Sequence, residues 1–314
     1  MSGIITSKKG MSRTTKRLIF SLLMVALPVL QFLIFYIYVN FNSILMAFQE
    51  YSANLDGLGY TVKFAGFKNF ADAWSVIFSE YGANMIKNSL ILYACNLVIV
   101  MGLALVFSYY VSKKFAASGF FRVMLYVPHI VSSVVLALLY RYVVTDIYGV
   151  ITLKMTGQTP VGGLLDNPDT QFMAVLFYNI WVGFGTNVML FTNAMSGINS
   201  SVVESAELDG VNIVQEFCYI YIPMIFPTFI TFVVTGMAGI FTNQMNMYTF
   251  FGTRGSYFDV LGFYLYREAQ SAAVVGTNIS YSMLAAMGLM ITCVVAPVTL
   301  LVRKLLEKYG PSAD

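Results

Sequence analysis

The sequence predicts an all-α polytopic membrane protein with six transmembrane helices and a short cytoplasmic helix between the fourth and the fifth. Mean hydropathy is +0.73, and 58% of the residues are hydrophobic whereas 11% are charged. A helix needs about 20 mainly apolar residues to cross a bilayer, and several charge-free stretches have this length. The alternating pattern typical of a transmembrane β-barrel is absent. The predicted spans are Leu18–Asn40, Asn88–Ser112, Val123–Tyr140, Phe172–Met195, Phe217–Asn243 and Leu284–Val302.

These spans divide the chain into five parts. Residues 1–17 form a basic tail, residues 18–40 the first span, and residues 41–87 an extracellular loop. Residues 88–303 hold the remaining five spans, and residues 304–314 form a second tail. The first apolar stretch is longer than the core of a signal peptide and has no small-residue cleavage site after it. We therefore expect it to remain as the first transmembrane span.

The distribution of Lys and Arg predicts the orientation, because cytoplasmic loops carry an excess of both. Basic residues gather in the amino-terminal tail, in the connection between spans two and three, and in the carboxyl-terminal tail. They are Lys8, Lys9, Arg13, Lys16, Arg17, Lys113, Lys114, Arg122, Arg303, Lys304 and Lys308. We therefore expect both termini, and the connection between spans four and five, to be cytoplasmic.

The residues needed for catalysis or metal binding are missing. The only histidine is His129, beside Pro128 in the third predicted span, so neither a His-rich metal site nor a Ser/His/Asp triad can form. We expect His129 to meet a neighbouring helix, with gating or proton transfer as the alternative. A phosphate-binding loop and nucleic-acid-binding basic runs are also missing. The three cysteines, Cys95, Cys218 and Cys293, are expected to be free thiols.

Ionisable residues are otherwise missing from the interiors of the predicted spans, whereas ion-coupled carriers normally place such residues there. This argues against an ion-coupled pump. It favours a neutral solute and an energy source outside this chain.

An acidic stretch, "ESAELDG" at residues 204–210, lies in the connection between spans four and five. Ser201 and Glu204 have the spacing of a capping box, and Glu204 and Glu207 would favour the positive end of a helix dipole. Gly210 suits a left-handed helix end, and Asn212 with Gln215 offers a second helix start. Val202, Ala206 and Gly210 would form a small-residue face. This helix could dock on a partner or be a solvated turn.

The spacing of this stretch resembles the EAA loop of ABC importer permeases. In that family E-A-A-x-x-x-G is followed by nine residues and I-x-L-P, and here "ESAELDG" is followed by nine residues and "IYIP". Ser205 and Ile222 replace an alanine and a leucine. Other segments resemble carbohydrate permeases in the same order along the chain, including the maltose-type first permease. They are "FAGFKNFADAW", "NSLIL", "FRVMLYVPHIVSSVV" and "DVLGFYLYREA".

The resemblance implies a set of partners and a role for the loop at residues 199–223. The partners are a second related permease, two cytoplasmic ATPase subunits that bind ATP and Mg, and an extracytoplasmic sugar-binding protein, in a bacterial plasma membrane. This chain itself would bind no cofactor. The loop would be a coupling helix seated on an ATPase, whose basic groups would answer the loop's carboxylates. The implied coupling residues are Ser201, Glu204, Ser205, Ala206, Glu207, Asp209, Gly210 and Pro223.

Polar and aromatic side chains at helical spacing in spans two, four and five are candidates for a sugar path, because amides and hydroxyls satisfy sugar hydroxyls and aromatic rings stack on sugars. The candidates are Tyr93, Asn96, Asn179, Trp181, Thr186, Asn193, Thr242 and Asn246. Small polar residues also pack transmembrane helices together, and we expect that role for Thr231, Thr235 and Gly239.

Import of a neutral sugar or oligosaccharide is the expected function. A polyol or glycerol-phosphate compound is the alternative within the family, although a phosphate would favour Arg or Lys facing the path. A stand-alone secondary carrier is the alternative from another class. The loop at residues 41–87 is expected to be a cap over the path that meets the binding protein, or a connector.

Overall fold

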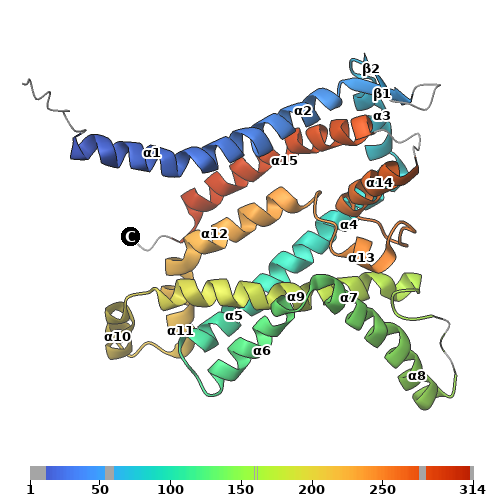
Figure 1. Ribbon diagram of the computed structural model, residues 1–314. Coiled ribbons are helices and arrows are strands. Elements are labelled where there is room, and N and C mark those ends of the chain that lie inside the picture. Colours follow the sequence, from blue (N-terminus) through green and yellow to red (C-terminus); the bar gives the residue numbers. More distant parts are fainter. Residues whose placement is uncertain (1–11, 54–59, 159, 161, 276–280, 312–314) are drawn as a thin grey trace, which may run out of the picture.

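The computed structural model describes residues 12–53, 60–158, 160, 162–275 and 281–311. Long helices run between two ends of the molecule (Figure 1). The short helix α10 (Ser200–Leu208) and the last turns of the helix α15 (Tyr281–Tyr309) lie at one end, which we call the α10 end. The hairpin of β1 (Gln49–Ala53) and β2 (Tyr60–Phe64) lies at the other, which we call the hairpin end.

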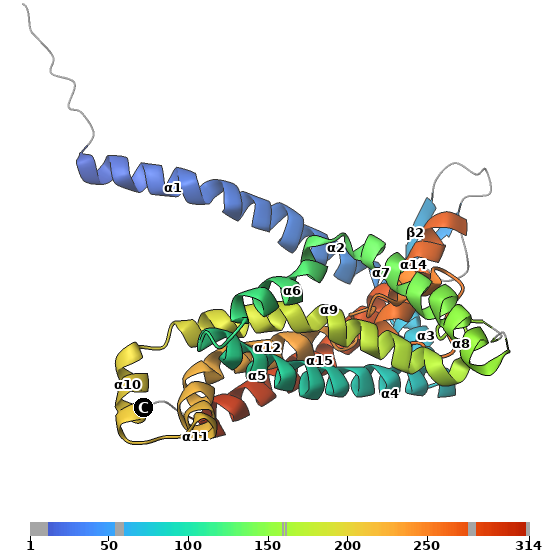
Figure 2. The same ribbon diagram turned by 90° about the horizontal axis from the view of Figure 1, so that it is seen from below.

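The first span is one continuous helical run, Arg13–Met46, and contains the predicted span. It consists of α1 (Arg13–Gln31), the π-helical segment η1 (Phe32–Tyr38) and α2 (Val39–Met46). Every residue of α1 and η1 is exposed. Figure 2 shows α1 leaving the bundle, whereas α2 packs along the last helix, α15 (Tyr281–Tyr309). The first span is therefore attached to the rest of the chain mainly through α2.

The segment between the first two spans is more ordered than the expected connector. Strands β1 and β2 pair antiparallel, with Gln49 opposite Phe64. The helix α3 (Lys68–Ile77) follows, and its Asn69 side chain donates hydrogen bonds to the carbonyls of Ala47 and Gln49, each at 2.9 Å. These bonds fix α3 to the start of the hairpin. Residues 54–59 of the turn-rich stretch lie outside the described residues.

The second span begins earlier than predicted and runs through Glu80–Ser112. It is made of α4 (Glu80–Cys95), η2 (Asn96–Val100) and α5 (Met101–Ser112). Ser79 caps α4 by accepting a hydrogen bond from the Gly82 amide at 3.0 Å. A Cβ at Gly82 would lie 2.2 Å from the Val76 carbonyl oxygen, so glycine allows α4 to turn back tightly on α3.

The prediction of one helix over residues 123–140 is wrong. Helix α6 (Ser118–Ile130) ends at Val131, whose backbone is extended, and α7 (Ser133–Tyr142) begins after Ser132. The chain continues as η3 (Val143–Ile147) and α8 (Tyr148–Thr156). The run Ser133–Thr156 is itself long and apolar enough to cross a membrane. The third span is thus interrupted at Val131 and Ser132, inside the stretch that hydropathy predicts as one helix.

Helix α9 (Pro168–Ser196) forms the fourth span and lies in the middle of the bundle (Figure 1). Its residues belong to two core clusters, with Val175 and Tyr178 in one and Val188 and Phe191 in the other. A Cβ at Gly185 would lie 1.9 Å from the Leu125 carbonyl oxygen of α6. Glycine therefore brings α9 against α6, as small residues do in membrane helix pairs.

The last two spans complete the bundle. The fifth consists of α11 (Ile213–Glu216), η4 (Phe217–Tyr221) and α12 (Ile222–Gly239), and α15 is the sixth. Between them lie α13 (Met247–Phe251) and α14 (Leu261–Val275) at the hairpin end. The chain is therefore the all-α, six-span membrane protein that the sequence predicts. The three cysteines are free, as expected.

Candidate functional site

The helix α10 is capped differently from the prediction. Asn199 is its cap and accepts a hydrogen bond from the Ser201 amide at 3.1 Å. Ser201 lies inside the helix, where its carbonyl accepts the Ser205 hydroxyl at 2.7 Å. The predicted Ser201–Glu204 capping box is therefore wrong. The helix-dipole argument is wrong as well, because Glu204 lies beyond the first turn and Glu207 lies in the last turn.

The glycine that ends α10 behaves as predicted. Gly210 has a φ of +77°, in the left-handed region that favours glycine. The Gly210 amide donates to the Glu207 carbonyl at 3.1 Å, and the Val211 amide donates to the Ala206 carbonyl at 3.2 Å. This pair of bonds is a Schellman motif. A short turn therefore follows α10 without leaving its last carbonyls unpaired.

The second helix start is also confirmed. Asn212 caps α11, with its side chain accepting from the Gln215 amide at 2.9 Å. The Gln215 side chain accepts in return from the Asn212 amide at 3.1 Å, which completes a capping box. The path from α10 into the fifth span is therefore fixed at both ends of the turn.

The carboxylate of Glu207 forms an ion pair with a lysine of this chain. Lys113, which follows α5, lies 3.0 Å from Glu207 and 2.9 Å from Glu216 of α11. Tyr109 donates a hydrogen bond to the other oxygen of Glu216 at 3.0 Å. Burial opposes the charged form of Lys113, but hydrogen bonds to the two carboxylates outweigh it and raise the pKa of Lys113. Glu207 therefore has a basic partner within this chain, which the sequence did not predict.

The free face of α10 also differs from the expected small-residue face. Ala206 is buried against the chain's own residues, whereas Val202 and Gly210 are exposed. Glu204 and Asp209 are exposed, and Leu208 is 89% exposed. The surface left for a partner therefore combines carboxylates with exposed apolar side chains.

A cavity of about 320 Å³, which we call the central cavity, lies between the second span, α9 and α12. Two of the predicted path residues, Tyr93 and Asn96, line it. The Tyr93 hydroxyl donates to the Val233 carbonyl at 3.1 Å, and a Cβ at Gly236 would lie 2.9 Å from the Tyr93 ring. The ring is therefore held against α12 at the edge of the cavity.

The same cavity contains residues that sequence reasoning missed. The side chains of Asn187 and Asn243 line it. An amide is costly inside an apolar span, and this criterion, applied to the whole fourth span, could have selected Asn187. Thr235 and Gly239 line the cavity too, and Thr231 and Thr235 are exposed. The expectation that these threonines pack helices together is therefore wrong within this chain.

Two other predicted path residues use their polar groups within the chain. Asn179 donates to the carbonyls of Val175 at 2.9 Å and Met245 at 3.0 Å. Its side-chain oxygen accepts from the Asn246 side chain at 3.2 Å. Asn246 has a φ of +58°. The two amides hold the turn before α13 against α9.

The remaining path candidates are spread over the surface of the chain. Thr186 contacts the ring of His129, whose Nε2 lies 2.7 Å from the Val182 carbonyl, so His129 meets the neighbouring helix as predicted. Trp181 packs edge-on against Tyr178 and is partly exposed. Asn193 is exposed and does not line the central cavity. Thr242 lines a second cavity, of about 330 Å³.

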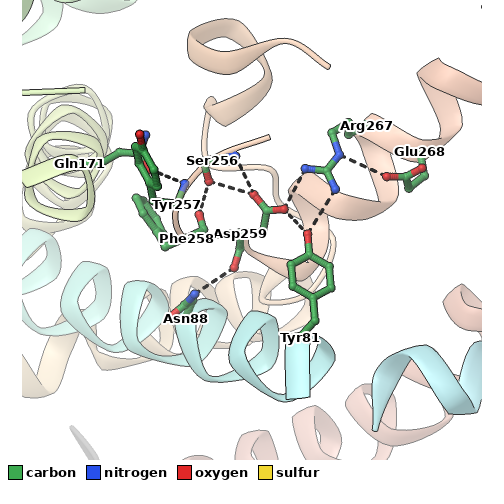
Figure 3. Close-up of polar contacts among 9 residues, drawn as sticks. All are labelled: Tyr81, Asn88, Gln171, Ser256, Tyr257, Phe258, Asp259, Arg267 and Glu268. Atoms are coloured by element: carbon green, nitrogen blue, oxygen red, sulfur yellow. Dashed lines mark hydrogen bonds and ion pairs between the residues drawn. The ribbon is translucent and has the colours of Figure 1, made fainter. Parts of the chain in front are cut away.

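A cluster of charged and polar residues lies at the hairpin end, around the buried carboxylate of Asp259 (Figure 3). Its carboxylate accepts from Arg267 at 2.8 Å, from the Ser256 hydroxyl at 2.9 Å and from the Ser256 amide at 3.2 Å. Tyr81 of α4 donates to it as well. We call Tyr81, Ser256, Asp259 and Arg267 the Asp259 cluster; it fastens the loop before α14 to α4.

Sequence analysis quoted this segment, "DVLGFYLYREA", only for its resemblance. The signal for a structural role was the pair Asp259 and Arg267, eight positions apart across the start of a helix. Their partner Tyr81 lies far away along the chain. Close to the cluster is a cavity of about 640 Å³ whose lining includes Arg141, Arg254 and Tyr257.

With this geometry described, the comparisons with known proteins decide the family. Residues 98–309 match the family described as the binding-protein-dependent transport system inner membrane component. The chain belongs to this family. As a transport-system membrane component it crosses the membrane several times, in agreement with the six apolar helices.

Individual transport permeases are similar to this inner membrane component at low identity. The arabinooligosaccharides transport system permease protein AraP of Bacillus subtilis is 24% identical over 284 residues, covering 88% of this chain and 85% of that protein. The probable starch degradation products transport system permease protein AmyD of Thermoanaerobacterium thermosulfurigenes is 27% identical over 174 residues. That match covers 53% of this chain and 56% of AmyD, so it spans about half of each.

The fold of this transport-system component is also found in a solved structure. A bacterial ABC transporter involved in the import of the acidic polysaccharide alginate contains a chain that matches with a TM-score of 0.73 and 20% identity. The match covers 95% of this chain and 100% of that chain. At this identity the likeness establishes the shared fold.

Proposed function

We propose that this chain is the membrane subunit of an ATP-driven importer of a sugar or oligosaccharide. The observation that carries the proposal is the exposed face of α10, held between the fourth and fifth spans by Asn199 at its start and Gly210 at its end. Such a helix, with exposed Glu204, Leu208 and Asp209, presents both charge and apolar area to a partner. The partner is a cytoplasmic ATPase subunit that binds ATP and Mg.

The rest of the assembly follows from this arrangement. The α10 end faces the cytoplasm of a bacterium, both termini are cytoplasmic, and the hairpin end faces outward. A second related permease completes the path across the membrane. An extracytoplasmic sugar-binding protein delivers the solute at the hairpin end. A neutral sugar is supported by the amide and phenol groups of Asn96, Asn187 and Tyr93 around the central cavity.

An acidic or phosphorylated solute is the second candidate, because of the cavity at the hairpin end. Arg141 and Arg254 both line it, and Arg141 donates to the Phe250 carbonyl at 2.9 Å. The relatives include the sn-glycerol-3-phosphate transport system permease protein UgpA of Agrobacterium fabrum, 24% identical over 207 residues. Substituting Arg254→Met separates the candidates: uptake of a neutral oligosaccharide is retained, whereas uptake of an acidic solute falls.

The coupling role is tested by reversing one charge on α10. Glu204→Lys should abolish co-purification of ATPase subunits with this chain and the solute-stimulated ATP hydrolysis, while the chain still inserts in the membrane. The control is Asp72→Lys, an equal charge reversal on the exposed surface of α3 at the hairpin end. Full solute-stimulated hydrolysis in Glu204→Lys would show that α10 does not dock through this face.

A further inference from the structure

Lys113 connects three helical elements at the α10 end. It follows directly on α5, and its ammonium group reaches Glu207 in the last turn of α10 and Glu216 in α11. The Glu216 side chain is only 5% exposed, whereas that of Glu207 is 58% exposed. Lys113 therefore makes a buried ion pair with the start of the fifth span and a more exposed one with α10.

The buried part of this arrangement is firmly built. Glu216 is held by Lys113 on one oxygen and by the Tyr109 hydroxyl on the other. The Tyr109 ring packs edge-on against Tyr221, with ring centroids 4.9 Å apart. Removing one partner from a buried ion pair leaves an uncompensated charge, which is costly. The Lys113–Glu216 pair therefore fastens the end of α5 to the start of the fifth span.

The exposed Lys113–Glu207 pair has a different role. Among the described residues, it is the ion pair that joins α10 to the end of the second span. Glu207 is a member of the acidic stretch, and the neighbouring Glu204 and Asp209 are exposed without such a pair in the same part of the chain. The acidic stretch is thus divided: one carboxylate faces the chain itself and two face outward.

The second span, which ends just before Lys113, also lines the central cavity. The second span is one helical run from Glu80 to Ser112, and its residues Tyr93, Asn96 and Met101 line the cavity. A displacement of the end of α5 is therefore passed along its regular α-helical turns to Met101 at the cavity wall, before the π-helical segment η2 begins.

We propose that Lys113 is a positioning residue that passes movement of α10 to the second span. The inference rests on the proposed docking of α10 on an ATPase subunit. When α10 moves with that subunit, the Lys113–Glu207 pair carries the second span with it. Loss of the pair leaves docking intact and weakens the connection between ATP hydrolysis and the cavity.

The Lys113–Glu207 ion pair itself is tested first, in this chain without its partners. Amide hydrogen exchange in α10 should speed up in Glu207→Gln and in Lys113→Met, because each removes the same ion pair. Lys114→Met is the matched control, since Lys114 is the adjacent lysine and makes no ion pair within the described part of the chain. Equal exchange in all three variants and the unsubstituted chain would show that the Lys113–Glu207 pair does not stabilise α10.

Transmission is tested in the assembled transporter in proteoliposomes, by measuring solute transported per ATP hydrolysed. Glu207→Gln should lower this ratio by up to about fivefold, the upper end of what an exposed ion pair contributes, with co-purification of the ATPase unchanged. Lys113→Arg should retain the ratio. The double variant Lys113→Met with Glu207→Gln should be no lower than Lys113→Met alone, because both act through one contact.

The outcomes separate this inference from the proposed function. If no ATPase subunit co-purifies with the unsubstituted chain, the proposed function itself fails. If the unsubstituted transporter couples normally and Glu207→Gln has the same ratio, only the role of Lys113 fails. Additive losses in the double variant would also overturn it. If Lys113→Met does not fold, because Glu216 stays buried without its partner, Glu207→Gln and Lys113→Arg still decide the question.

Discussion

The carboxylate of Asp259 offers a quantitative test of the Asp259 cluster. Asp259→Asn keeps the size of the side chain and removes its charge. The Asp259 side chain is 3% exposed and that of its partner Arg267 is 13% exposed, so the guanidinium loses its closest anion in a buried site. Arg267 keeps one other carboxylate, Glu268, at 3.2 Å.

The expected loss in the free energy of unfolding is about 3 kcal/mol, the lower part of the range for breaking a buried ion pair, because Glu268 remains. The assay is thermal unfolding of the purified chain in detergent. Glu50→Gln is the matched control, because it removes the same charge from the exposed Glu50–Lys68 pair at the same end of the molecule, where the separation is also 2.8 Å. The control should leave the unfolding midpoint unchanged.

A second variant keeps the test decisive. Asp259→Leu together with Arg267→Met and Glu268→Gln removes all three charges and should be less destabilising than Asp259→Asn, because no charge remains buried alone. An unfolding midpoint for Asp259→Asn equal to that of the unsubstituted chain would refute the reasoning. A triple variant less stable than Asp259→Asn would refute it as well.

Three further outcomes are expected. Gly185→Ala should destabilise the chain by about 1–3 kcal/mol in thermal unfolding, because its Cβ would overlap the Leu125 carbonyl; Gly183→Ala, whose Cβ would lie 3.8 Å from Val100, should be tolerated. Gly210→Val should reduce ATPase co-purification more than Gly210→Asn, because the space is open but φ is +77°; equal effects would point to bulk as the cause. Raising the pH from about 7 to 9 should leave the amide protection factors of α10 unchanged once the base-catalysed intrinsic rate is divided out, because the raised pKa of Lys113 keeps its ion pairs until the pH passes above the ordinary lysine value; lower protection factors at pH 9 would contradict this.

The sequence predicts the spans well because hydropathy depends on composition over about 20 residues. It does not predict the interruption at Val131 and Ser132, because two residues in an apolar run leave that average unchanged. Whether the backbone there is extended or helical depends on what α6 and α7 pack against. The sequence also does not predict the early start of α4 at Glu80, because the charged residues Glu80 and Lys87 lie within the helix and lower its average hydropathy.

In the loop between spans four and five, some features follow from the local sequence and others depend on contacts with distant helices. Gly210 and the Asn212–Gln215 box were predictable because local backbone geometry requires those residue types. The choice of Asn199 over Ser201 as the cap was not, since both are good caps two positions apart. Pairing of Glu207 with Lys113 depends on how distant helices meet, and no local pattern contains it.

The long helix α9 has a mechanical consequence. It is a single helix of 29 residues, without an interior proline, and only a short turn separates it from α10. Gly185 lets it press directly on α6, so this crossing can serve as a fulcrum. At 1.5 Å per residue, α9 extends roughly 26 Å from the crossing toward Pro168 and roughly 16 Å toward Ser196. If α9 pivots there, its two ends swing in opposite directions, and a small stroke beside α10 becomes a larger one at the hairpin end.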